Sequence, residues 1–135
     1  MKWLVGLMTL MVFTLAGWFW LVPKPFEPIA LETKIINLGQ VEVSVVPQDV
    51  VADKPVVFKL DFTTHSIDLD YDLTQVVSAQ DDRGNTYIVS SWSGGSGGHH
   101  LQGELTLAPL QSGVKQLILS FKNINGEGGE LMWQL

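Results

Sequence analysis

Apolar and polar residues alternate with a period of two through most of the chain after residue 40. Successive side chains of a strand point to opposite faces, so this alternation predicts strands with one buried face. Turn-forming residues separate the runs, and no stretch of this region has the apolar stripe of a helix. We therefore predict an all-β fold, an antiparallel immunoglobulin-like β-sandwich. The predicted strands are 41–45, 56–63, 67–73, 87–89, 101–107, 114–121 and 131–135.

The first part of the chain is hydrophobic instead. Residues 3–22 contain no charge and no proline, and as a helix they would span about 30 Å, the thickness of a bilayer core. Prolines follow directly and would end such a helix. The sequence predicts a signal anchor or transmembrane helix at 1–22, a Pro-rich linker at 23–39 and the β-sandwich domain at 40–135.

A cleaved secretory signal is the alternative for this leader. Ala16 is an acceptable last residue before cleavage, but the mature chain would then begin with an exposed apolar stretch at Gly17. An uncleaved anchor makes the protein a single-pass membrane protein with its C-terminal domain extracytoplasmic, and cleavage makes it secreted. Both alternatives place the domain outside the cytoplasm.

Composition excludes several functions. The net charge of −6 provides no basic surface for nucleic acid, so no nucleic-acid partner is expected. The chain has no cysteine, which excludes disulfides, zinc–thiolate sites, blue-copper centres and iron–sulfur clusters.

The three histidines occur at strand ends. His65 follows one predicted strand, whereas His99 and His100 precede another after a glycine-rich stretch. Strands distant in sequence meet at the poles of a sandwich, and imidazole is the commonest metal ligand. We predict a divalent metal site for zinc or copper with ligands His65, Asp68, His99 and His100, in which only one of the two adjacent histidines binds. The alternative is three polar loop residues without a ligand.

Two further aspartates share a face with Asp68 if the segment is a strand. Asp70 and Asp72 would repel one another there, which suggests a solvated face, a cation or a basic partner. Trp92 precedes the glycine-rich stretch, where an aromatic side chain can anchor a partner or cover the core. Asp70, Asp72 and Trp92 are therefore the candidate partner-binding residues.

The glycine-rich stretch at 94–98 matches the pattern around a serine-hydrolase nucleophile. That pattern requires a strand before it and a helix after it, and neither an α/β sheet nor a following helix is expected here. We therefore do not expect Ser96 to be a nucleophile, and we do not expect an enzyme.

Two short motifs carry a resemblance. Thr64-His65-Ser66-x-Asp68-Leu69-x-x-Asp72-Leu73 and Trp92-Ser93-Gly94 with Gly97-Gly98-His99-His100-x-x-Gly103 resemble a motif pair in small exported prokaryotic domains of unknown function. The resemblance covers about a third of the chain and implies export without implying an activity.

The function expected from the sequence is that of a membrane-anchored extracytoplasmic binding module with a divalent metal at a His/Asp pole. The alternative is a protein-interaction or scaffold domain of a cell-envelope complex without metal.

Overall fold

The structure is a computed structural model that describes residues 30–135. The predicted membrane helix at 1–22 and the part of the predicted linker at 23–29 lie outside the described residues. Between residues 30 and 135, no helix has the length and apolar character that crossing a membrane requires.

The described chain consists of strands and one short helix. The elements are β1 (Lys34–Leu38), β2 (Val41–Pro47), β3 (Pro55–Thr63), α2 (Leu73–Val76), β4 (Val77–Asp81), β5 (Thr86–Tyr87), β6 (Val89–Trp92), β7 (His100–Pro109), β8 (Gln116–Ile124) and β9 (Glu127–Gln134).

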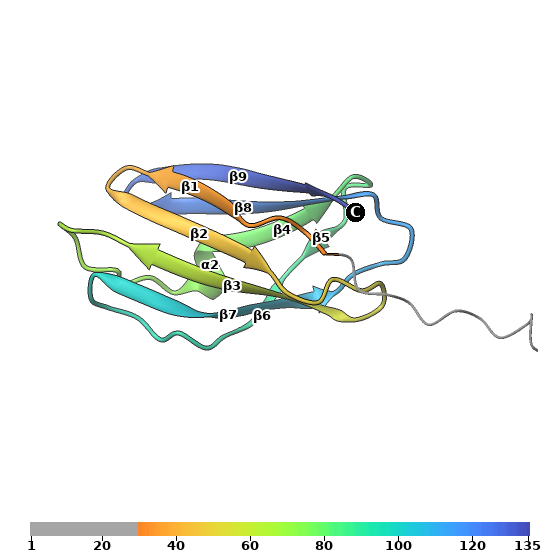
Figure 1. The fold of residues 1–135 in the computed structure, drawn as a ribbon, viewed down its shortest axis with the longest axis horizontal. Helices are drawn as coiled ribbons and strands as arrows, with labels where there is room; N and C mark the ends of the chain where they lie inside the picture. Colours follow the sequence, from red (N-terminus) through yellow and green to blue (C-terminus); the bar gives the residue numbers. More distant parts are fainter. Residues whose placement is uncertain (1–29) are drawn as a thin grey trace, which may run out of the picture.

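The strands form two antiparallel sheets, which lie face to face (Figure 1). One sheet has the order β1-β2-β3-β7-β6, and the other has the order β5-β4-β8-β9. Apolar side chains from both sheets form one core, which explains why the sheets pack together. The predicted all-β architecture of two antiparallel layers is confirmed.

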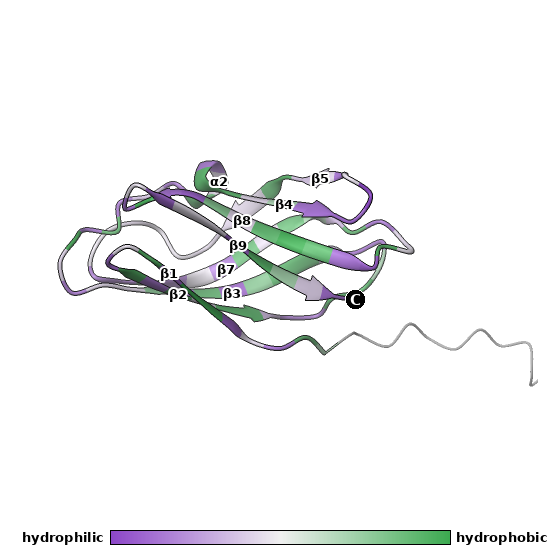
Figure 2. Cartoon of the chain, turned by 90° about the horizontal axis from the view of Figure 1, so that it is seen from above, coloured by the Kyte–Doolittle hydropathy of each residue, from purple (hydrophilic) through white to green (hydrophobic). Residues whose placement is uncertain are grey.

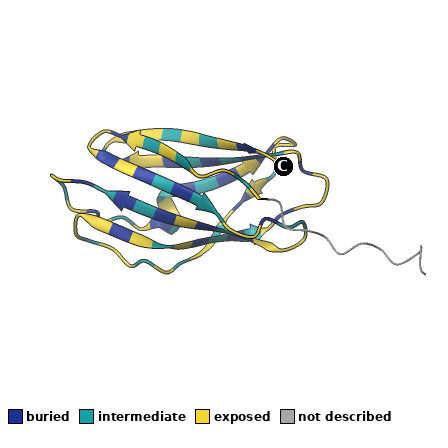
Figure 3. Cartoon of the chain, in the orientation of Figure 1, coloured by how far each residue is buried: buried dark blue, intermediate teal, exposed yellow. Residues whose placement is uncertain are grey.

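Burial alternates along the strands, as the sequence pattern predicts. In β3, Val56, Phe58, Leu60 and Phe62 are buried while Lys59 is exposed, and Figure 3 shows the same alternation on neighbouring strands. Figure 2 shows hydrophobic stretches on β3, β7 and β8 in the middle of the fold. Each fully buried side chain of this size stabilises the fold by about 1.5–3 kcal/mol relative to an exposed one.

The predicted strand at 67–73 is wrong. Leu69 and Leu73 are buried, so the alternation of burial is present, but the segment belongs to neither sheet. Helix α2 begins within the predicted strand, at Leu73. Asp72 caps the helix, because its Oδ1 accepts a hydrogen bond from Thr74 N at 3.0 Å. An aspartate that bonds to nearby backbone offers the chain an alternative to a sheet ladder.

The predicted strand at 87–89 is divided between the two sheets. Tyr87 ends β5 and faces the core, whereas Val89 begins β6 in the other sheet. Ile88 makes the crossing between them and is 70% exposed. Strand β4, which the sequence analysis did not predict, pairs with β5 on one side and β8 on the other.

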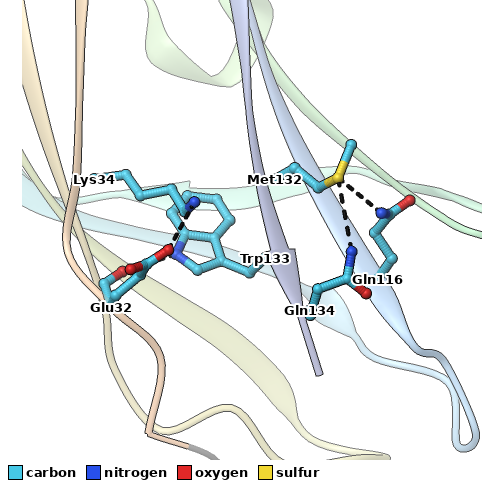
Figure 4. A network of polar contacts seen from close by, with 6 residues as sticks. All are labelled: Glu32, Lys34, Gln116, Met132, Trp133 and Gln134. Carbon is cyan, nitrogen blue, oxygen red and sulfur yellow. Dashed lines mark hydrogen bonds and ion pairs between the residues drawn. The ribbon is translucent and has the colours of Figure 1, made fainter.

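The fold begins before residue 40. Strand β1 lies within the predicted linker at 23–39 and pairs along its whole length with β2. It packs closely on β9: a Cβ on Gly129 would lie 2.5 Å from Ile36 Cδ1, so the isoleucine side chain would have to shift. Figure 4 shows that Trp133 of β9 and Lys34 of β1 lie close together. Trp133 Nε1 donates to Glu32 O at 2.8 Å, and Lys34 Nζ lies 6.0 Å from the centre of the indole ring.

A buried aspartate organises the turn between β4 and β5. Asp81 is 3% exposed and accepts hydrogen bonds from Arg83 N, Asn85 N, Asn85 Nδ2 and Tyr87 Oη, at 2.8–3.0 Å. Burial raises the pKa of the Asp81 carboxyl, but the hydrogen bonds from Asn85, Tyr87 and Arg83 together lower it to about 2, below its ordinary 3.8.

The depressed pKa predicts how stability depends on pH. The Asp81 contribution is present above the ordinary pKa and is lost as pH falls toward about 2. We expect Asp81→Asn to lower the free energy of unfolding by about 2 kcal/mol at pH 7 and by much less near pH 2, as urea unfolding would measure. The exposed Asp49→Asn is the control and should change stability little at either pH. An equal loss from Asp81→Asn at both pH values would contradict the assignment.

Candidate functional site: the histidine pole

The three histidines lie at the end of the sandwich where β3 ends and β7 begins (Figure 1). His100 is the first residue of β7 and pairs with Thr63, the last residue of β3. One step further, Thr64 N donates to His99 O at 3.0 Å. The segment that carries His65 therefore runs beside the segment that carries His99 and His100. We call this end the histidine pole; the start of β1 and the C-terminus lie at the other end (Figure 1).

Two loops beyond the strands hold each other in place at this pole. They are residues 64–72, the aspartate loop, and residues 93–99, the glycine loop. Leu69 N donates to Gly98 O and Gly97 N donates to Leu69 O, both at 2.9 Å. Gly98 N also donates to Asp68 Oδ1 at 2.5 Å. These bonds continue the contact between β3 and β7 beyond the sheet.

The glycine loop is supported by Trp92 from beneath. The indole Nε1 donates to Gly95 O at 2.8 Å, and the ring packs edge-on against Phe62 with 6.4 Å between centroids. A Cβ on Gly94 would lie 2.5 Å from Gln102 O, and one on Gly103 would lie 2.5 Å from Gly94 N. Only glycines fit there, because backbone and indole already occupy the space.

Left-handed backbone explains the remaining glycines of the loop. Gly95, Gly97 and Gly98 have φ angles of 69°, 94° and 81°, which other residues adopt at a cost. The glycine-rich sequence is thus a structural requirement of the loop. Ser96 lies exposed within it, and strand β7 rather than a helix follows, unlike the hydrolase pattern.

The aspartates and the tryptophan singled out from the sequence have structural contacts of their own. Asp68 bonds to the glycine loop, and Asp72 accepts from both Thr74 N and Thr74 Oγ1 at the start of α2. Asp70 is exposed. Trp92 is half-buried against the core. The structure brings Asp68 close to Gly97 and Gly98, directly before the adjacent histidines.

The side chains of His65, His99 and His100 are exposed. Thr63 Oγ1 lies 3.4 Å from His100 Nδ1 and also donates to Asp61 Oδ1 at 3.3 Å. Within residues 30–135, no three His, Cys, Asp or Glu side chains are grouped so that they could hold a metal ion. The metal site with His65, Asp68, His99 and His100 therefore stays a prediction.

His65 lines a hollow of about 260 Å³ between the β1–β2 turn and the end of β3. Glu42, Gln40 and Thr63 line the same hollow, and Gln40 contacts Ser66 through its amide oxygen. Glu42 is not among the residues that the sequence singles out. The alternation in 41–45 places it on the outward face, but only the register between β2 and β3 brings it to His65.

A larger hollow of about 550 Å³ lies toward the other end of the molecule. It contains no histidine, and its lining residues are Gln48, Asp49, Val51, Lys54, Pro55, Val57 and Glu104.

The turn between β4 and β5, which carries Asp81, Asp82 and Tyr87 with their shifted pKa values, also lies at that end (Figure 1). There, burial raises the pKa of Tyr87, and its hydrogen bond to Asp81 raises it further. The backbone hydrogen bond from Lys115 N lowers the pKa of Asp82.

No family model, curated protein or solved structure matches the chain.

The packing of the glycine loop predicts the effect of a single methyl group. We expect Gly103→Ala to lower the free energy of unfolding by about 1–3 kcal/mol, because the Cβ overpacks Gly94 and the Trp92 ring. Tryptophan fluorescence should change in the folded state as the indole moves. The exposed Ser96→Ala serves as the control and should alter neither property. Unchanged stability and emission in Gly103→Ala would show that this packing is absent.

Proposed function

We propose that this protein is a membrane-tethered extracytoplasmic binding module whose histidine pole binds a divalent transition metal, zinc or copper. The observation that carries the proposal is the hydrogen bond from Thr64 N to His99 O. It sets the segment with His65 beside the segment with His99 and His100, although more than thirty residues separate them in sequence. Neutral imidazole is the side chain that both metals bind most often.

The surroundings of the histidines favour a binding surface. The glycine loop rests on Trp92 and is bonded to the aspartate loop, so the backbone under the imidazoles is ordered before a ligand arrives. Ordering the backbone in advance lowers the entropic cost of binding. The exposed imidazoles can then rotate toward a common ion at small cost.

The tether forms part of the same proposal. Residues 1–22 have the length and the apolar character of a transmembrane helix. Strand β1 starts at the end of the sandwich opposite the histidine pole (Figure 1). A domain held by its N-terminal segment would therefore present the histidines away from the membrane. We also propose that the sandwich is immunoglobulin-like, which its size and two antiparallel sheets support.

We propose binding rather than catalysis at this pole. The chemistry-bearing residues there are exposed imidazoles and carboxylates, and two of the carboxylates, Asp68 and Asp72, already accept backbone hydrogen bonds. Ser96 has no hydrolase elbow around it. The function class that remains is recognition of a ligand or partner by the pole.

Zinc titration tests the proposal. A ligand that binds only the folded state adds about 2.7 kcal/mol of stability at a hundred times its Kd. Metal binding needs neutral imidazole, so we expect zinc to raise the Tm at pH 7.5 and not at pH 5. A variant in which His65, His99 and His100 are all alanine should show no rise at pH 7.5. The proposal fails if neither zinc nor copper raises the Tm of the natural sequence at pH 7.5.

A further inference from the structure

Four polar side chains form a row across the outer face of the five-stranded sheet, the face turned away from the second sheet. The strand registers pair Asn37 with Glu42, Glu42 with Thr63, and Thr63 with His100. The row therefore crosses β1, β2, β3 and β7 at the histidine pole. Inward-facing neighbours such as Phe62 are fully buried, which confirms that the row faces outward.

Glu42 and His100 flank Thr63 from its two sides. Adjacent strands lie about 4.8 Å apart, so the backbones of Glu42 and His100 are about 10 Å apart. Thr63 is much shorter than either flanking side chain, so a space above its hydroxyl is open to both. Thr63 Oγ1 and His100 Nδ1 are 3.4 Å apart, so the imidazole already lies beside the threonine hydroxyl.

His65 approaches the same row from beyond the end of β3. It lines the hollow of about 260 Å³ together with Glu42 and Thr63. His65 and Glu42 therefore face the same hollow. His100 lies next to that hollow, because it contacts Thr63, which also lines it. Glu42 and both histidines are exposed, so rotation about side-chain bonds alone can bring them together.

Although no three such side chains of residues 30–135 are grouped around a common point as they stand, we infer that Glu42, His65 and His100 turn toward one another to become the protein ligands of a divalent metal ion held above Thr63, with zinc as the ion that fits best. This inference rests on the function proposed above and changes its ligand set. A His₂Glu set leaves the fourth position of a tetrahedral zinc ion to water or to a ligand from a partner. Asp68 then acts on the loops through its bond to Gly98, and His99 contributes its backbone carbonyl to Thr64.

The Glu42 carboxylate is a better metal ligand than the Asp68 carboxylate for two reasons. The Asp68 carboxylate is engaged by a short backbone hydrogen bond, which competes with metal for its lone pairs. Glu42 lies on the sheet itself, and sites on regular elements hold their ligands more precisely than sites on loops. A second carboxylate nearby, Asp61, already accepts from Thr63 Oγ1 and from Gln102 Nε2.

Calorimetric titration of the full-length chain in detergent with zinc alone tests the inference. Glu42→Gln keeps the shape of the side chain and removes its charge, and we expect it to raise the Kd at least about tenfold, since even second-shell changes cost 10–100-fold. His65→Ala and His100→Ala should each have a comparable effect. His99→Ala and Asp68→Asn should leave the Kd within a factor of about three, because neither removes a ligand.

A matched control separates ligation from general charge. Glu104 occupies the same sheet face two rows away, opposite Lys59, so Glu104→Gln removes the same charge without touching the site. Equal weakening by Glu42→Gln and Glu104→Gln would overturn the inference. So would tight binding that survives Glu42→Gln but is lost in Asp68→Asn, although the proposed function would then stand. Failure of zinc to bind the natural sequence would overturn both.

Discussion

The histidine pole depends on backbone hydrogen bonds between two loops that are not part of either sheet. Buried or crowded N–H and C=O groups need partners, and loops at the end of a sandwich usually find them in water or side chains. Here the aspartate loop and the glycine loop satisfy each other through Thr64, Leu69, Gly97 and Gly98. The position of every candidate ligand on these loops follows from that pairing.

The pairing itself is possible because of what lies under the glycine loop. Trp92 fills the space between the loop and Phe62, and its N–H bonds to the loop carbonyl at Gly95. Side chains at Gly94 or Gly103 would displace the loop from the indole. Core packing thereby determines the shape of an exposed surface, and the shape of that surface determines where the histidines stand.

Much of the architecture could be predicted because one buried face per strand leaves a period-two pattern in the sequence. The pattern shows which side chains are buried but not which strands pair. It therefore predicted a strand at residues 67–73, although this segment bonds to the glycine loop and to neither sheet. It also joined Tyr87 and Val89 in one strand, because nothing local shows that the chain changes sheets at Ile88. Strand β1 does not show the alternation in its sequence, because Ile35 and Ile36 are adjacent apolar residues and Ile35 is exposed.

The candidate site, like the fold, could be predicted only in part from the sequence. Sandwich topology and the positions of His65, His99 and His100 suffice to predict that their segments approach each other at one pole. The role of Asp72 could not be predicted, because the spacing of the aspartates fits a strand and does not show that Asp72 instead bonds to backbone and caps α2. Glu42 was hidden for another reason: its neighbours across the sheet are set by register, which depends on turn geometry and on packing throughout the core.

Amide hydrogen exchange by NMR tests the pairing of the two loops most directly. If the loops are bonded as described, the amides of Thr64, Leu69, Gly97 and Gly98 exchange slowly, with protection close to that of amides in β3 and β7. The amide of the exposed Ser96, in the same loop, exchanges fast and provides the internal reference. Exchange of Thr64 and Leu69 as fast as that of Ser96 would contradict the account, because the histidine-bearing segments would then not be held together.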